Sequence, residues 1–167
     1  MNKKTSTVYL VQAAFIAAVY VALTHFLEPI PFSGTQLRVA EALTLLPVLT
    51  PAAVPGLTIG CILANLSSPY GVVDIICGSV ATLLAALCTW KMRNIRLKSV
   101  PILPALFPVI FNAVIVGAEI SALGTGGFTW PVFGATAASV ALGECVACFG
   151  LGLPLCAALQ KTKIFDL

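Results

Sequence analysis

Long apolar stretches separated by short polar segments form the dominant pattern along this chain. Four stretches are long enough for a helix rising about 1.5 Å per residue to cross the roughly 30 Å hydrocarbon layer of a membrane. They cover residues 8–27, 72–90, 101–122 and 131–159. A further apolar stretch, residues 38–66, could form either one long tilted span or two short ones broken by Pro47, Pro51 and Pro55. The pattern predicts a bundle of membrane-spanning helices.

The basic residues decide between these arrangements, because lysine and arginine concentrate on the cytoplasmic side of membrane proteins. With two short spans between residues 38 and 66, every basic residue except Arg38 falls on one side: Lys3, Lys4, Lys91, Arg93, Arg96, Lys98, Lys161 and Lys163. With a single span, the two N-terminal lysines would face away from the other six. We therefore expect one all-α transmembrane domain over residues 1–167, with about six helices, multi-pass in the plasma membrane, and with both termini in the cytoplasm.

The composition excludes an ordinary soluble domain. The chain is 59% hydrophobic and 9% charged, whereas soluble domains carry about 25% charged residues. The net charge of +3 is small and does not indicate a nucleic-acid partner. All six cysteines lie inside apolar stretches, so we interpret them as small hydrophobic side chains and expect no metal site.

Polar residues gather in the outer half of the predicted spans, while the inner halves are almost entirely apolar. Ionisable residues are costly inside a membrane and commonly mark functional sites. A pore or a proton relay would need polar residues through the whole depth, so the asymmetry favours a pocket that opens outward. A structural network of buried hydrogen bonds is the alternative. The candidate substrate-binding residues are Arg38, Glu41, Asn65, Ser68, Tyr70, Asp74, Asn112, Glu119 and Glu144.

The spacing of these residues suggests partners. Arg38 and Glu41 lie three positions apart, so they share a helix face and can pair. Asn112 and Glu119, seven apart, also share a face. If Arg38 satisfies Glu41, three carboxylates remain, and a carboxylate can bind a cationic amine or accept two parallel N–H bonds from a guanine-type edge. For Glu144, a protonated carboxyl group with local hydrogen bonds is the alternative.

Aromatic residues lie near the predicted outer surface. They could stack on a flat ligand or form an ordinary interfacial belt; they are Phe32, Tyr70, Phe128 and Trp130. His25 lies at the outer end of the first span, where we interpret it as an interfacial residue rather than a ligand-binding one.

The first span carries a ridge of small residues. Ala14, Ala18 and Ala22 recur every four positions, with Ala13 and Ala17 beside them. Such a ridge lets another helix approach closely in lipid, and that helix could belong to the same fold or to a partner subunit. A second small pair, Gly56 and Gly60, is expected to pack internally.

Motifs of several enzyme classes are absent from the sequence. It has no G-x-x-x-x-G-K-[ST] phosphate loop, so the chain does not hydrolyse ATP by that route. It also lacks HExxH and GxSxG, and its single histidine disfavours a metalloenzyme. We therefore expect no catalytic residues and no cofactor.

Four segments together resemble the QueT family: LRVAEALTLLP (37–47), ANLSSPYGVVDIICG (64–78), FNAVIVGAE (111–119) and LGECVAC (142–148). Members of that family are substrate-binding S components of energy-coupling factor (ECF) transporters for queuosine precursors. The resemblance implies a six-helix S-component bundle that binds a 7-deazaguanine base or queuine. It also implies a partner module, made of a transmembrane T subunit and two cytoplasmic ATPases. Ala14, Ala18 and Ala22 are similar to the alanine motif that meets the T subunit.

The resemblance also suggests roles for the polar residues. Glu119 or Glu144 would hold the guanine-like edge, Asp74 or Glu41 would neutralise the amine, and the two asparagines would complete the hydrogen bonding. The excess of carboxylates suits a cationic base better than a neutral cyano form. The competing hypotheses are a stand-alone secondary transporter, an S component for another vitamin-like solute, and a structural subunit that binds no solute.

Overall fold

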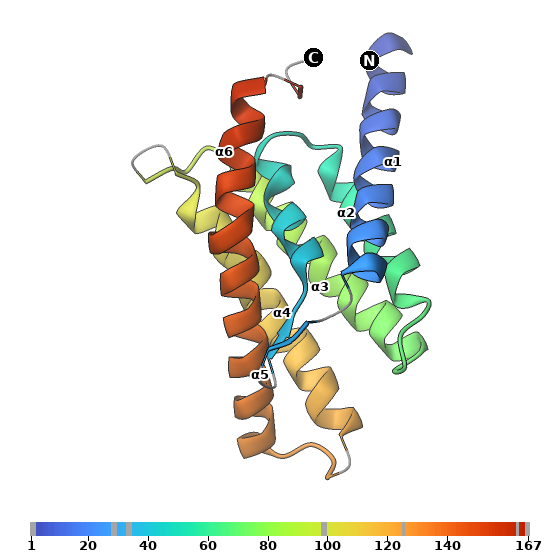
Figure 1. The fold of residues 1–167 in the computed structure, drawn as a ribbon, viewed down its shortest axis with the longest axis vertical. Coiled ribbons are helices and arrows are strands. Elements are labelled where there is room, and N and C mark those ends of the chain that lie inside the picture. Colours follow the sequence, from blue (N-terminus) through green and yellow to red (C-terminus); the bar gives the residue numbers. More distant parts are fainter. Residues whose placement is uncertain are drawn as a thin grey trace.

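Helices run up and down the long axis of the molecule, and the chain reverses direction between successive long helices (Figure 1). The computed structural model describes residues 3–27, 30–32, 35–97, 100–124, 126–162 and 164–165. In chain order the elements are α1 (Lys3–Phe26), β1 (Ile30–Phe32), β2 (Thr35–Leu37), the 3₁₀-helix η1 (Val39–Val48), α2 (Ala53–Asn65), α3 (Val72–Lys91), α4 (Ile102–Leu123), α5 (Trp130–Cys145), the π-helix η2 (Val146–Gly152) and α6 (Leu153–Thr162).

Among the described residues, four helices are long and apolar enough to cross a membrane, and they confirm the four long spans predicted from the sequence. They are Ser6–Phe26, Val72–Lys91, Ile102–Leu123 and Trp130–Thr162. The last of these is a single rod built from α5, η2 and α6, in which the π-helical turns of η2 follow α5 without a break.

The proline-containing stretch forms two short elements rather than one long one. η1 and α2 are separated by a turn at residues 49–52, so of the three prolines only Pro51 lies at the break. At about 2.0 Å per residue in a 3₁₀-helix and about 1.5 Å in an α-helix, each element spans roughly 20 Å. That is shorter than the hydrocarbon layer, so the prediction of six complete crossings stays a prediction.

One small sheet departs from the all-α prediction. β1 and β2 pair antiparallel, with Ile30 opposite Leu37 and Phe32 opposite Thr35. The sequence analysis missed this hairpin, because three-residue strands have no detectable periodicity. The hairpin matters for the site because β2 ends immediately before Arg38.

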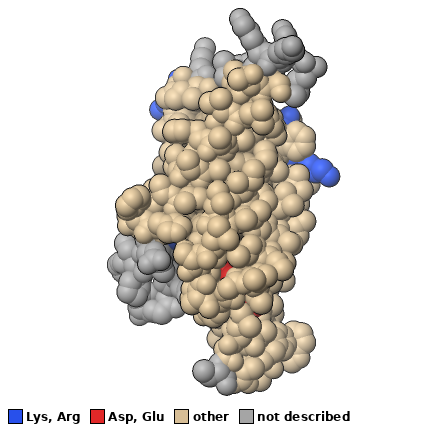
Figure 2. All heavy atoms as spheres, turned by 90° about the vertical axis from the view of Figure 1, so that its right-hand side faces the viewer, with Lys and Arg blue, Asp and Glu red and all other residues tan. Residues whose placement is uncertain are grey.

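Both ends of the chain lie at one end of the bundle (Figure 1). The loop after α3 reaches the same end, and Lys and Arg atoms lie mainly toward it on the face drawn in Figure 2. The rest of that face is almost free of charge, as a lipid-facing surface requires. Four residues used in the charge argument fall outside what the structure describes: Lys98 and Lys163 entirely, and the side chains of Lys3 and Lys4. The membrane side of this end stays a prediction.

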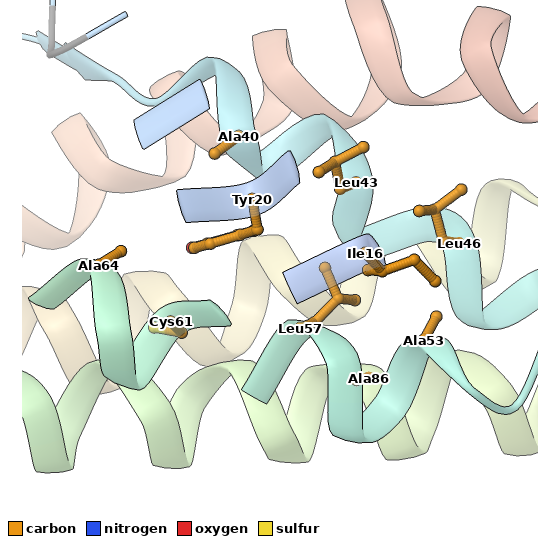
Figure 3. Close-up of a cluster of buried hydrophobic side chains, with 10 residues drawn as sticks. All are labelled: Ile16, Tyr20, Ala40, Leu43, Leu46, Ala53, Leu57, Cys61, Ala64 and Ala86. Atoms are coloured by element: carbon orange, nitrogen blue, oxygen red, sulfur yellow. The ribbon is translucent and has the colours of Figure 1, made fainter. Parts of the chain in front are cut away.

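η1 occupies the middle of the bundle. All of its residues except Val39 are buried, and it packs against α1, α3 and η2. Figure 3 shows its side chains Ala40, Leu43 and Leu46 in one cluster with Ile16 and Tyr20 of α1. The central position of η1 places its polar residues deep inside the molecule.

Small residues bring α1 and α2 together. A Cβ atom on Gly56 would lie 2.7 Å from the carbonyl oxygen of Ala13, and one on Gly60 would lie 3.2 Å from the Cα of Ala17. The prediction that Gly56 and Gly60 pack internally is therefore confirmed.

Candidate functional site

The start of η1 carries the first two candidate residues. Arg38 is its N-cap, and the Glu41 N–H donates a hydrogen bond of 3.1 Å to the Arg38 carbonyl oxygen. Both residues border the same cavity, but their side chains form no ion pair. The reason is local: Arg38 has extended backbone angles, φ −94° and ψ 105°, so the helical spacing that would align the two side chains begins after it.

Glu41 has a different partner, Tyr20 on α1. The Tyr20 hydroxyl donates a hydrogen bond of 2.6 Å to Glu41 Oε1. The second oxygen, Oε2, is buried and has no hydrogen-bond partner. Glu41 is thus fixed in place by one oxygen, while the other keeps its capacity to accept a hydrogen bond.

Glu144 is bound by the helix next to it. Asn112 of α4 donates a hydrogen bond of 2.8 Å to Glu144 Oε1. The Cys148 thiol, one turn further along, lies 3.8 Å from Glu144 Oε2 and 3.8 Å from the Glu41 carbonyl oxygen. Thr44 lies 3.5 Å from the same sulfur. Each Glu144 oxygen therefore has a neighbour within hydrogen-bonding distance, and both oxygens retain further lone pairs.

These residues surround a small polar space that we call the inner cavity. Its volume is about 30 Å³. A cavity of that size holds one or two groups the size of a water molecule and no ring. It is lined by Arg38, Glu41, Cys61, Gly78, Thr82, Asn112, Val116, Val140, Gly143 and Glu144.

A second, larger space adjoins it and is called the outer cavity here. Its volume is about 280 Å³, close to the lower end of the range for small-molecule sites. Asn65 and Asp74 are buried in it, whereas Ser67 and Tyr70 are exposed where α2 meets α3. The α2–α3 turn lies away from the chain termini (Figure 1). The lining is Leu23, Thr24, Leu27, Arg38, Val39, Ala40, Ala64, Asn65, Ser67, Ser68, Pro69, Tyr70 and Asp74.

Arg38 borders both cavities and therefore stands where they are adjacent. It lies close enough to interact electrostatically with each of the four buried carboxylates in the described part of the chain, which come from η1, α3, α4 and α5: Glu41, Asp74, Glu119 and Glu144. One guanidinium cannot neutralise four carboxylates. The surplus of acceptors suits a ligand that brings a cation or several N–H groups.

A close contact between α2 and α3 fixes the part of the outer cavity's wall that contains Asn65 and Asp74. The Asn65 side chain donates a hydrogen bond of 3.0 Å to the backbone carbonyl of Asp74, joining α2 to α3. A Cβ atom on Gly78 would lie 2.5 Å from Asn65 Nδ2 and 3.6 Å from Asp74 Oδ1. Gly78 therefore leaves the space that these two polar side chains occupy.

Glu119 stands apart from the other candidates. It is 5% exposed, both of its carboxylate oxygens lack a hydrogen-bond partner, and it lines neither cavity. Its electrostatic neighbours are Asp74 and Arg38. Glu119 thus lies outside the walls of both cavities, near Asp74 and Arg38.

Eight of the nine predicted site residues line one of the two cavities or both, and Glu119 lines neither. Arg38, Glu41, Asn112 and Glu144 line the inner one, and Arg38, Asn65, Ser68, Tyr70 and Asp74 line the outer one. Phe128 and Trp130 line neither cavity; they pack with Phe133 in edge-to-face and tilted contacts, and Trp130 is 76% exposed. The side chain of Phe32 lies outside the described part of the chain. Tyr70 is the aromatic residue that borders the outer cavity.

Sequence reasoning missed several residues of the site. Tyr20, Thr44 and Cys148 hold the buried glutamates, and Thr82 lines the inner cavity. Each lies in an apolar stretch with no local signal, and the clearest case is Tyr20, whose partner Glu41 lies on a different helix. His25 is exposed and contacts Ser67 at 3.1 Å, as an interfacial residue would.

α1 presents two rows of small residues. Ala13 and Ala17 are buried against α2, as described above, whereas Ala14 and Ala18 are exposed and Ala22 is half-buried. The inner row, Ala13 and Ala17, therefore packs against α2 within the fold. The outer row is open along α1 for a neighbouring helix.

Comparison with known proteins identifies the family. No solved structure matches the chain. The queuosine precursor transporter QueT of Lactococcus lactis subsp. cremoris (strain MG1363) is 36% identical over 84 residues, which is 49% of this chain and 49% of that protein. The match thus spans about half the length of that relative. Residues 10–161 match the model of the QueT transporter family. The chain therefore belongs to the QueT transporter family and is a multi-pass protein of the cell membrane.

Proposed function

We propose that this chain is the substrate-binding S component of an ECF-type importer and captures a queuosine precursor outside the cell for ATP-driven uptake. The observation that carries the proposal is the pair of cavities that meet at Arg38, beside four buried carboxylates. The substrate class follows the name of the Lactococcus relative. Two members of that class, 7-aminomethyl-7-deazaguanine and queuine, are cations at neutral pH and would use the surplus of carboxylates.

The outer cavity suits the bicyclic base. Its volume of about 280 Å³ accommodates two fused rings. The Asp74 carboxylate would accept the two parallel N–H bonds of the guanine-type edge, which is a strong, charge-assisted arrangement. The exposed ring of Tyr70 would stack on one face of the base.

Arg38 would orient the base at the junction of the cavities. An arginine donates readily to the carbonyl oxygen of a guanine-like ring. The aminomethyl arm of the deazaguanine leaves the ring beside that carbonyl, so a base whose carbonyl faces Arg38 points its arm at the inner cavity. There the arm would meet Glu41, whose Oε2 has no other partner, and Glu144.

The partner module would dock on α1. Ala14, Ala18 and Ala22 form the outer row of small residues, which the fold itself leaves open. We infer that the T subunit packs against this row, while two cytoplasmic ATPases supply the energy. The sequence has no phosphate loop for ATP hydrolysis, so energy from ATP would come from such partners.

Uptake of a labelled base tests the proposal. Cells that lack other uptake routes would express the chain alone, or together with a T subunit and both ATPases. We expect accumulation of 7-aminomethyl-7-deazaguanine only in the second case, abolished by a phosphate-loop lysine substitution in the ATPases. Full accumulation by the chain alone would instead support a secondary transporter.

A further inference from the structure

We propose that the small volume of the inner cavity limits the size of the substituent (the arm) on the base. The site therefore accepts a primary aminomethyl group and discriminates against larger arms such as the cyclopentenediol of queuine. The inference rests on the proposed function, in which the ring lies in the outer cavity. It selects one substrate from the class of queuosine precursors and assigns Val116 and Val140 as the residues that set the limit.

The two volumes support this division. The outer cavity, at about 280 Å³, has room for the ring, whereas the inner cavity, at about 30 Å³, has room only for a group the size of one or two water molecules. A primary ammonium is such a group. A cyclopentenediol ring is several times larger and does not fit without moving the walls.

The acceptors of the inner cavity match a primary ammonium. A primary ammonium has three N–H donors, and the cavity offers Glu41 and Glu144 as carboxylate neighbours, with Oε2 of Glu41 lacking any other partner. A secondary ammonium retains the charge but has one donor fewer, and its second carbon substituent needs space on the same nitrogen. The difference between the two arms is therefore one of size and of one hydrogen bond, not of charge.

Close helix packing keeps the walls of the inner cavity in place. Val116 of α4 and Val140 of α5 form its apolar side. Between these helices, a Cβ atom on Gly117 would lie 2.9 Å from the Cα of Ala137, so the two backbones are already in contact. Thr136 of α5 also donates a hydrogen bond of 2.9 Å to the Gly117 carbonyl oxygen. The cavity can therefore be enlarged by substitution more readily than by movement of the helices.

A series of arms on one base tests the inference. Purified chain in detergent would be titrated by calorimetry with 7-aminomethyl-7-deazaguanine, its N-methyl and N-propyl derivatives, and queuine, all of them cationic. The same titrations would use Val116→Ala, which enlarges the inner cavity. Val114→Ala is the matched control, because Val114 lies two residues away on the same helix and is exposed.

We expect affinity to fall along the series, with queuine about 10- to 100-fold weaker than the aminomethyl base, a typical effect of methylene-sized misfits in a binding pocket. Val116→Ala should reduce that ratio at least several-fold, whereas Val114→Ala should leave it unchanged. Queuine that binds as tightly as the aminomethyl base, or a ratio unaffected by Val116→Ala, would overturn the size filter and leave the proposed function standing. If no member of the series binds folded protein, the proposed function itself fails.

Discussion

The hydroxyl group of Tyr20 donates a hydrogen bond of 2.6 Å to Oε1 of Glu41, across 21 positions of sequence. Tyr20 is 1% exposed and Glu41 is 4% exposed, so the bond is shielded from solvent and from lipid. It holds the carboxyl group with one oxygen and leaves Oε2 available. The hydrogen bond thus stabilises the bundle and also positions the Glu41 carboxyl group at the site.

Replacing Tyr20 by phenylalanine should destabilise the protein. Removing the hydroxyl leaves Glu41 with two unpartnered buried oxygens, which costs about 1–3 kcal/mol. Thermal unfolding in detergent would measure the loss as a lower midpoint. Tyr9→Phe is the control, because its hydroxyl makes only a long, exposed contact of 3.5 Å with the Pro51 carbonyl. Equal midpoints for the two variants would contradict the importance of the Tyr20–Glu41 bond.

Asp74→Asn should weaken binding of the aminomethyl base by about 10-fold or more, because a charge-assisted pair of hydrogen bonds contributes roughly 1.5–3 kcal/mol. Glu119→Gln should weaken it less, since Glu119 lines neither cavity. Calorimetric titration of both variants provides the comparison. A larger loss for Glu119→Gln would mean that the base edge lies against α4 instead.

Gly56→Ala should destabilise the fold without affecting the ligand site. The added Cβ would lie 2.7 Å from a backbone oxygen of α1, which cannot rotate away as a side chain can. Gly134→Ala is the matched control: no atom lies within 4 Å of its added Cβ, and alanine is a better helix former than glycine by about 0.8–1.0 kcal/mol. The midpoints of thermal unfolding should therefore shift in opposite directions. A stabilising Gly56→Ala would show that α1 and α2 are less closely packed than described.

Ala18→Leu should block assembly with the T subunit while leaving ligand binding intact. Ala18 is exposed, so the larger side chain does not disturb the chain itself, but it would prevent the close approach of another helix. Co-purification of the T subunit measures assembly, and calorimetry measures binding. Ala138→Leu, at an exposed position on α5, is the control. Normal co-purification with Ala18→Leu would place the partner surface elsewhere.

The sequence predicted the four long helices because apolar length alone defines a membrane span. It also predicted most polar residues of the two cavities, since a charged or amide side chain is conspicuous in an apolar helix. Five of these residues border at least one cavity: Arg38, Glu41, Asp74, Asn112 and Glu144. The pairing of these residues was not predictable. Glu41 bonds Tyr20 rather than Arg38, because the partner comes from another helix and Arg38 precedes the first helical residue of η1.

The irregular elements also escaped prediction. The hydrophobic pattern of residues 39–48 and 146–152 indicates helix, but it does not distinguish 3₁₀ or π from α geometry. Glu41 lies in η1, Glu144 lies two residues before η2, and these two irregular helices pack against each other. The two cavities are lined by residues from several helices, so their separation depends on helix packing, which the sequence does not reveal.

The most direct test of the account is calorimetric titration of the purified chain with 7-aminomethyl-7-deazaguanine and with the neutral analogues guanine and 7-cyano-7-deazaguanine, repeated with Glu41→Gln. We predict that the cationic base binds at least 10-fold more tightly than either neutral one, because its ammonium can pair with the carboxylates of the inner cavity, and that Glu41→Gln removes most of this preference. Equal affinity for all three bases, or a preference that survives Glu41→Gln, would contradict the assignment of the buried carboxylates to a cationic substrate.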